Sequence, residues 1–143
     1  MSVIQLQEYV IERVFYTVDA QSETTFQTGF LLNYEDQLSE TKPEGKVRVG
    51  VQIKSETSEV PVFECQALGT FVLMEENAYE ALSPFPETFL KTAFSILYGM
   101  IRALAIQISA TAPKGKLMLP LIDPTAIVLG YLAETASQTP TQA

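Results

Sequence analysis

The chain has 143 residues, enough for one domain with a buried core, and 17 acidic residues against 9 lysines and arginines give a net charge of −8. This acidic balance argues against binding to nucleic acid or to an anionic membrane, because both attract a basic surface. The sequence has no histidine and one cysteine, which excludes Ser-His-Asp and Cys-His catalysis, most zinc sites and an intrachain disulfide. It also lacks GxGxxG and P-loop motifs. We therefore expect a non-enzyme without a cofactor, and the lack of a charged and then apolar leader favours the cytoplasm.

Strand patterns occupy the first half of the chain, over residues 5–18, 26–34, 46–54 and 60–74. The third pattern is the clearest, because strict alternation predicts a buried face made of Val47, Val49, Val51 and Ile53. Short links between consecutive strands predict an antiparallel sheet. The polar segment 35–45 is expected to be a mobile loop.

The first and fourth patterns carry apolar residues on both faces. In the fourth, Cys65 falls among inward-facing residues, where a small buried hydrophobic residue is the ordinary interpretation. In the first, alternation predicts one face with Tyr9, Ile11, Arg13 and Phe15, opposite Val10, Glu12, Val14 and Tyr16.

A long helix is predicted to follow a short helix or lid-like connection over residues 75–85. Pro84 and Pro86 suit its first turn, and the helix is expected to continue to about Ala110, before Pro113 and Gly115 end it. Large side chains at helical spacing predict a stripe that packs on the sheet, made of Phe89, Leu90, Ala93, Phe94, Leu97, Ile101, Leu104 and Ile108. Together these patterns predict an α+β fold, with a four-stranded antiparallel sheet packed against one long helix and a shorter C-terminal helix.

A second stripe on the same helix carries mostly small side chains, which suits the close approach of another helix. It consists of Thr92, Ile96, Gly99, Ala103, Ile106 and Ala110. We predict from it a homo-oligomer, a dimer or a dimer of dimers. The alternative is a core helix that is buried all round. A narrow wet edge is predicted at Lys91, Ser95, Tyr98, Arg102 and Ser109, and its two charges argue against a membrane span.

The last part of the chain predicts an extended segment over residues 116–123 and a final helix through about Ser137. Asp123 and Pro124 form an N-cap and first-turn pair for that helix. Its apolar side is predicted to be Ile127, Val128, Tyr131 and Leu132. We expect one domain over residues 1–137, followed by a polar tail, 138–143.

This order of elements resembles SecB, the protein-export chaperone family, with the present chain as a divergent member. The opening strand, Ile11-Glu-Arg-Val-Phe15, is similar to the family's Ile-x-Arg-Ile-Tyr pattern. Phe63-Glu-Cys-Gln66, followed by Gly69-Thr-Phe71, resembles its Phe-x-Cys-Glu strand. A helix opening at Pro84-Phe85-Pro86 with a central Arg102 is also similar. The run Leu117-Met-Leu-Pro120-Leu-Ile122-Asp123 resembles the family's Leu-x-Leu-Pro-Pro-Val-Asn-Phe.

The resemblance implies a chaperone (a holdase) that assembles through its sheet edges and long helices. Family members hold unfolded precursor chains in apolar grooves and pass them to the translocation ATPase SecA, without a cofactor or bond chemistry. The groove residues implied here are Phe71, Leu73, Met74, Tyr79, Leu82, Phe85, Phe89, Leu119, Leu121 and Ile122.

The family docks SecA on an acidic outer face of the sheet, and the residues that the resemblance places there are Asp19, Glu23 and Glu64. The sequence departs from the family at this face. Gln66 replaces the acidic residue of the strand motif, the third strand carries Lys46, Arg48 and Lys54, and the tail is uncharged.

Two other functions stay open. One is a dedicated chaperone for a single client, such as the antitoxin of a toxin–antitoxin pair, which the altered outer face favours. The other is a non-catalytic protein that uses the fold only to assemble oligomers. A small-molecule binder or an enzyme comes last.

Overall fold

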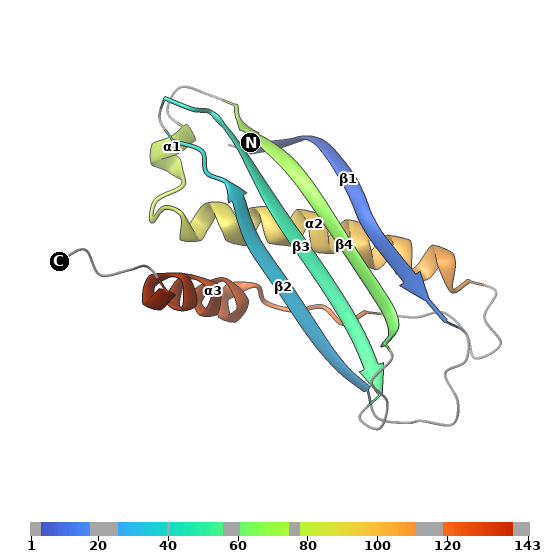
Figure 1. Ribbon diagram of the computed structural model, residues 1–143. Coiled ribbons are helices and arrows are strands. Elements are labelled where there is room, and N and C mark those ends of the chain that lie inside the picture. Colours follow the sequence, from blue (N-terminus) through green and yellow to red (C-terminus); the bar gives the residue numbers. More distant parts are fainter. Residues whose placement is uncertain are drawn as a thin grey trace.

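A computed structural model of the protein describes residues 4–17, 26–39, 41–55, 61–74, 78–110 and 119–138. Its strands are β1 (Ile4–Tyr16), β2 (Phe26–Asp36), β3 (Glu44–Ser55) and β4 (Pro61–Leu73), and its helices are α1 (Ala78–Ala81), α2 (Glu87–Ile108) and α3 (Thr125–Gln138). The strands form one antiparallel sheet in the order β1-β4-β3-β2, so β1 and β2 are its edges. Helix α2 crosses one face of this sheet, and α3 lies beside β2 (Figure 1). The predicted α+β architecture is confirmed.

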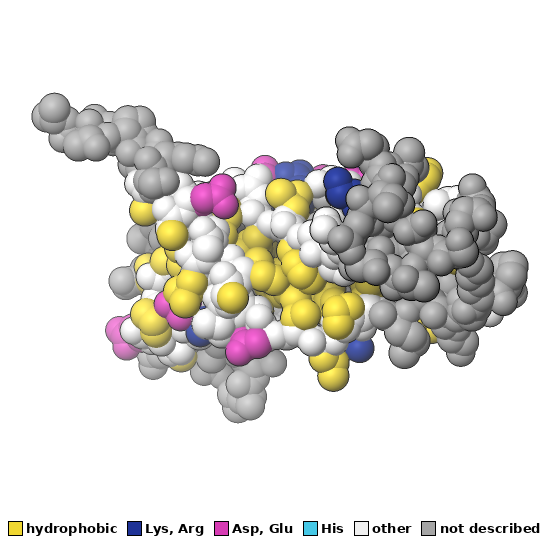
Figure 2. Space-filling view, turned by 90° about the horizontal axis from the view of Figure 1, so that it is seen from below, with side chains coloured by type: hydrophobic (Ala, Val, Ile, Leu, Met, Phe, Trp, Pro, Cys, Tyr) yellow, Lys and Arg dark blue, Asp and Glu magenta, His cyan; other side chains and the backbone are white. Residues whose placement is uncertain are grey.

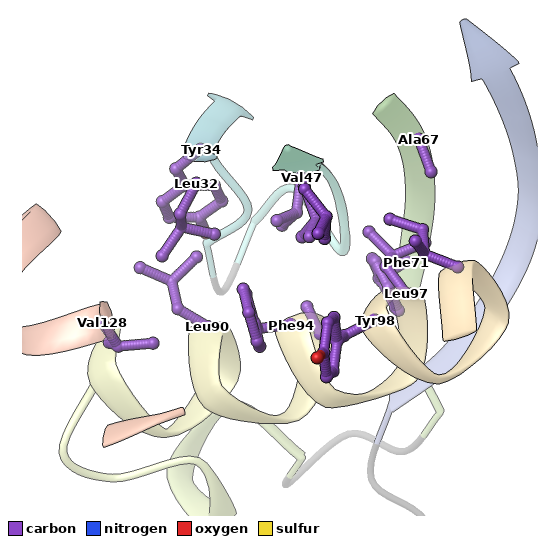
Figure 3. Close-up of a cluster of buried hydrophobic side chains, with 14 of the residues drawn as sticks. Leu32, Tyr34, Val47, Ala67, Phe71, Leu90, Phe94, Leu97, Tyr98 and Val128 are labelled. Atoms are coloured by element: carbon purple, nitrogen blue, oxygen red, sulfur yellow. The ribbon is translucent and has the colours of Figure 1, made fainter. Parts of the chain in front are cut away.

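The core lies between the sheet and α2, and it follows from the two periodicities in the sequence. On β3 the alternating residues Val47, Val49, Val51 and Ile53 are all buried, as predicted. On α2 the large-residue stripe turns toward them, with Leu90, Phe94 and Leu97 pointing at the strands (Figure 3). Helix α2 is long and apolar enough to cross a membrane by length and composition alone. Of the apolar window that meets this test, 44% is buried, and the buried part is the stripe that faces the sheet.

The predicted faces of β1 are wrong beyond Ile11. The pairing of β1 with β4 shifts between Leu6 and Glu8, and again between Ile11 and Arg13. Each such bulge adds one residue to one strand and reverses the alternation after it. Val14 and Tyr16 pair with buried residues of β4 and so share the face of Tyr9 and Ile11, whereas Arg13 and Phe15 turn to the opposite face.

The predicted wet edge of α2 is also partly wrong, because Tyr98 and Ser109 are buried. The Tyr98 hydroxyl donates to the carbonyl of Pro120 at 2.6 Å, and Arg102 Nε donates to the carbonyl of Leu119 at 3.2 Å. Ser109 Oγ donates to the carbonyl of Ala105 at 2.6 Å. A polar group satisfied in this way can be buried at little cost, and the first two bonds hold the extended segment before α3 against α2.

The connection between β2 and β3, which was expected to be a loop, makes hydrogen bonds over its described residues. The strands extend to Asp36 and from Glu44, so the turn is shorter than the sequence predicts. Ser39 and Lys42 exchange two backbone hydrogen bonds, at 2.8 and 3.2 Å. Leu38 is buried, and its N–H donates to the hydroxyl of Tyr34 at 3.1 Å.

The helix ends follow the capping signals in the sequence. Helix α2 begins at Glu87, directly after Pro86, so the prolines precede its first turn rather than occupy it. Helix α3 likewise begins directly after a proline, at Thr125, and the predicted cap is present: Asp123 Oδ1 accepts hydrogen bonds from the backbone N–H and the hydroxyl of Thr125, at 2.9 and 2.7 Å. These bonds satisfy the first turn of α3 and lower the pKa of Asp123.

Candidate functional site

A groove of about 530 Å³ opens between the edge strand β2 and helix α3. Seen from below, the side on which α3 lies, hydrophobic side chains gather in a central patch (Figure 2). The described residues that line the groove are Phe30, Leu31, Leu32 and Asn33 of β2, with Ala126, Ile127, Gly130, Tyr131, Glu134 and Thr135 of α3. We call this hollow the β2–α3 groove.

The groove exists because α3 turns small residues toward β2. Ala126 and Gly130 lie four residues apart along the same side of the helix, and the longer Glu134 follows one turn later. A methyl group placed at Gly130 would have no neighbour within 4 Å. The space that larger side chains would fill is therefore open to another molecule.

The strand edge beside the groove carries main-chain donors and acceptors. The N–H of Tyr34 points away from the sheet and donates to the hydroxyl of Tyr131 at 3.0 Å. Since backbone groups of an antiparallel strand point alternately to either side, those of Leu32 and Phe30 face the same way. The unpaired edge of a strand is a template for an added strand.

The charges around the groove favour a ligand that is neutral or basic. Among the described residues that line the groove, Glu134 carries the charge, which is negative. The whole chain carries a net charge of −8. An apolar segment with basic flanks is therefore attracted, whereas an acidic segment is repelled.

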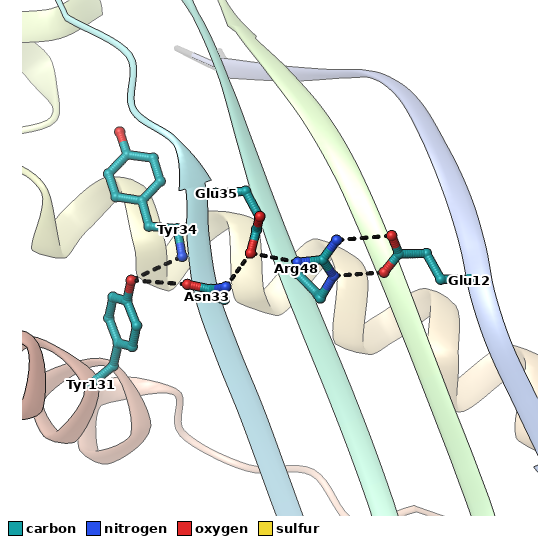
Figure 4. A network of polar contacts seen from close by, with 6 residues as sticks. All are labelled: Glu12, Asn33, Tyr34, Glu35, Arg48 and Tyr131. Carbon is teal, nitrogen blue, oxygen red and sulfur yellow. Dashed lines mark hydrogen bonds and ion pairs between the residues drawn. The ribbon is translucent and has the colours of Figure 1, made fainter.

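A polar network runs from the outer face of the sheet to the edge of this groove (Figure 4). Arg48 of β3 holds Glu12 of β1 in a bidentate pair, with Nε and Nη2 donating at 2.6 and 2.9 Å. Its Nη1 also pairs with Glu35, which accepts a hydrogen bond from the Asn33 side chain. The Tyr131 hydroxyl in turn donates to Asn33 Oδ1 at 3.4 Å. We call these five residues the Arg48 network.

Both ends of the bidentate pair are stabilised in their charged forms. The hydrogen bond from Arg48 lowers the pKa of Glu12, and the same bond raises the pKa of Arg48. The pair is therefore ionised at neutral pH.

Two further hollows lie elsewhere on the molecule. One, of about 250 Å³, separates β1 from α2 and is lined by Tyr9, Ile11, Met100, Ala103, Leu104 and Gln107. The other, of about 260 Å³, lies over Gly29 and Gly50 on the sheet.

The structure distributes the groove residues expected from the sequence over core and surface. Buried in the core are Phe71, Leu82, Phe89 and Leu119, which leave no surface for a ligand. Four others are half-buried: Leu73, Tyr79, Phe85 and Ile122. The rings of Tyr79 and Phe85 pack on each other, with their centroids 4.6 Å apart. Met74 and Leu121 are exposed, Leu121 by 82%.

The expected docking and interface residues lie on two other surfaces. Glu64 is on the outer face of the sheet, where it pairs with Arg13 at 3.6 Å and accepts from Gln52 at 3.4 Å, whereas Asp19 and Glu23 lie outside the described residues. The small-residue stripe lies on the side of α2 turned away from the sheet. Gly99, Ala103 and Ala110 are exposed there, and Thr92, Ile96 and Ile106 are half-buried.

The described residues contain no cluster of acidic or cysteine side chains that could hold a metal ion. Cys65 is fully buried, and burial raises the pKa of its thiol to about 11, which keeps it from acting as a nucleophile.

The residues of the β2–α3 groove escaped the sequence analysis almost entirely. The final helix was expected to pack through Ile127 and Tyr131, but not to border a groove. The available signal was Gly130 inside an apolar helix, where a glycine costs helix stability and often marks a packing or functional need. The strand order, which brings β2 beside α3, is not readable from the sequence.

No family model matches the sequence, and no curated protein sequence matches it. Among solved structures, the chain is similar to a SecB-like chaperone from Mycobacterium tuberculosis, solved in complex with a ChAD peptide from the HigA1 antitoxin. The identity is 16%, the TM-score is 0.56, and the match covers 83% of this chain and 87% of the other. A protein of unknown function from Streptococcus agalactiae matches at 13% identity and a TM-score of 0.44, over 82% of this chain and 97% of the other. The chain therefore has the fold of a SecB-like chaperone.

Proposed function

We propose that this protein is a SecB-type chaperone that holds unfolded or precursor polypeptide segments in the β2–α3 groove. The observation that carries the proposal is this open, mostly apolar groove beside a strand edge, in a fold shared with a chaperone that binds a peptide. Such a site suits many sequences, because main-chain hydrogen bonds give affinity and the apolar walls accept varied side chains. The preferred client is an extended apolar segment with neutral or basic flanks.

A dedicated chaperone for one client, such as an antitoxin, is the second candidate. The outer face of the sheet favours it, because Glu64 there is paired with Arg13 and the neighbouring Gln66 is uncharged. A translocase such as SecA would find little free acidic surface among these residues. A general role in export from the cytoplasm requires that SecA bind elsewhere on the chain.

We also propose that the working form is a homo-oligomer. In the single chain, Val10, Val14 and Phe15 of the edge strand β1 are each at least 40% exposed, and the outward side of α2 is largely apolar. Covering both surfaces with further copies would remove apolar area from water.

The first experiment is an aggregation assay. A denatured, reduced client is diluted into buffer with and without the protein, and light scattering is followed. Suppression at near-stoichiometric amounts with several clients supports the general holdase. Suppression with one client alone supports the dedicated chaperone, and no suppression with any client contradicts both.

A groove-filling variant assigns the activity to this site. Gly130→Leu places a large side chain in the open space of the β2–α3 groove and improves helix propensity by roughly 0.8 kcal/mol. We expect suppression to be lost while the free energy of unfolding does not fall. Ala136→Leu adds a similar side chain at an exposed position of α3 outside the groove, and it should suppress aggregation as the wild type does.

A further inference from the structure

The contacts that hold α3 against the sheet are few. Among the described side chains of α3, only Val128 is fully buried, whereas Ile127, Tyr131 and Leu132 are half-buried. Tyr131 adds two polar contacts with β2 to this packing, and they tie the middle of α3 to that strand.

Those contacts depend on a side chain at the far end of the Arg48 network. Tyr131 accepts from the N–H of Tyr34 and donates to Asn33. Asn33 can present its oxygen to Tyr131 because its amide nitrogen is engaged by Glu35. Glu35 is held in turn by Arg48, which Glu12 orients from the opposite edge of the sheet (Figure 4).

We propose that Arg48 is a positioning residue for the β2–α3 groove, although it does not line the groove. Through Glu35 and Asn33 it orders the hydroxyl of Tyr131, and so fixes the wall that α3 forms. A wall that is already ordered costs less entropy when a peptide binds than one that must first be ordered. Peptide affinity then depends on an ion pair on the outer face of the sheet. This inference rests on the function proposed above.

Arginine is suited to this role by its shape. Its planar fork binds both oxygens of Glu12, and a third nitrogen reaches Glu35. A lysine would keep the charge but could not hold both carboxylates in fixed geometry. Arg48→Lys should therefore behave like Arg48→Met, whereas a role of the charge alone would let lysine rescue the site.

The test is a double-mutant cycle on peptide affinity. The probe is a fluorescein-labelled peptide of about 12 residues, alternating leucine and serine with lysine at each end, titrated by fluorescence anisotropy. We expect Arg48→Met and Tyr131→Phe each to weaken binding about three- to fivefold, the size of a partly exposed ion pair. If both act through the same contact, the double variant binds no more weakly than either single one.

Arg13→Met is the matched control, because Arg13 also pairs with a glutamate on the outer face, and that glutamate, Glu64, is not a member of the Arg48 network. Its peptide affinity should equal that of the wild type. Fully additive effects of Arg48→Met and Tyr131→Phe, or an equal loss in Arg13→Met, would overturn the proposal.

Hydrogen exchange separates this inference from the proposed function. In Arg48→Met, amides of residues 128–132 in α3 should exchange several-fold faster, while those in the middle of α2 keep their rates. If the wild type binds no peptide, the proposed function fails, but this measurement still decides whether Arg48 positions α3. Unchanged exchange in α3 would refute the positioning role by itself.

Discussion

Cys65 reports on whether the core opens. It lies on β4 beneath α2 with no exposed surface, and burial raises the pKa of its thiol to about 11. A disulfide reagent needs both access and a thiolate. We predict that a thiol reagent at pH 8 leaves the native protein unmodified, and that labelling tracks global unfolding as guanidinium is added. The measurement compares the labelling rate with the circular dichroism transition, and rapid labelling of the native protein would contradict the buried position.

Glu12 makes stability depend on pH in a defined direction. Its folded pKa lies below the ordinary value of 4.5, chiefly because of the hydrogen bond from Arg48. The unfolded chain therefore binds more protons in acid, so the contribution is complete above pH 4.5 and is lost as pH falls through the lower folded pKa. We predict that Glu12→Gln lowers the free energy of unfolding by about 0.5 kcal/mol at pH 7, a typical value for an exposed pair.

Urea unfolding at several pH values checks this prediction. The difference between wild type and Glu12→Gln should shrink steadily below pH 4.5. A difference of constant size down to strong acid would show that the variant acts through packing rather than through the Arg48 pair.

At the scale of elements, Gly69 lets α2 approach the sheet closely. A methyl group at this position would come within 2.9 Å of Leu97 and 3.0 Å of Leu6. Leu97 is fully buried in the core, and Phe71 would also lie only 3.1 Å from the added methyl, so several packed side chains would have to shift together. We predict that Gly69→Ala lowers the free energy of unfolding by about 1–3 kcal/mol, as overpacked cores do.

Gly50 supplies the control for that substitution. It is also inside a central strand, but its added methyl would meet Leu31 and Gln66 on the outer face, at 3.1 and 3.3 Å. The 3.1 Å contact is with the Cβ of Leu31 on the edge strand β2, and a displacement of that strand by a few tenths of an ångström relieves it. Gly50→Ala should therefore cost less than Gly69→Ala in urea unfolding, and an equal loss in both variants would refute the close approach of α2 as the cause.

The elements that the sequence predicts well are those set by local chemistry. The alternation in β3 continues without a bulge through its buried valines, and the Asp123 cap starts α3 where its side chain can reach Thr125. The faces of β1 could not be predicted, because its bulges depend on the pairing with β4. Tyr98 was misplaced for a similar reason, since its buried hydroxyl is satisfied by Pro120, a residue of a distant segment.

The candidate groove was beyond the sequence because it belongs to the whole molecule. It requires β2 to be an edge strand and α3 to return beside it, and neither follows from local pattern. The resemblance of the motifs to SecB predicted the fold correctly. Some of the residues that it implied for a groove are buried in the core of the structure. Phe71 and Phe89 illustrate this, because large aromatic residues predict burial equally well in a groove and in a core.

The outward side of α2 tests the assembly proposed for the whole molecule. Gly99 is exposed there, and a methyl group at its Cβ position would meet no atom within 4 Å. In an isolated chain Gly99→Leu should stabilise α2 by roughly 0.8 kcal/mol, because glycine is a poor helix former. In an oligomer paired through this stripe, the same leucine overpacks the interface. We predict that Gly99→Leu lowers the molar mass measured by light scattering after size exclusion, with Ala136→Leu as the unaffected control. A wild-type mass of one chain, or an unchanged oligomer in the variant, would show that the small residues of α2 do not pair subunits.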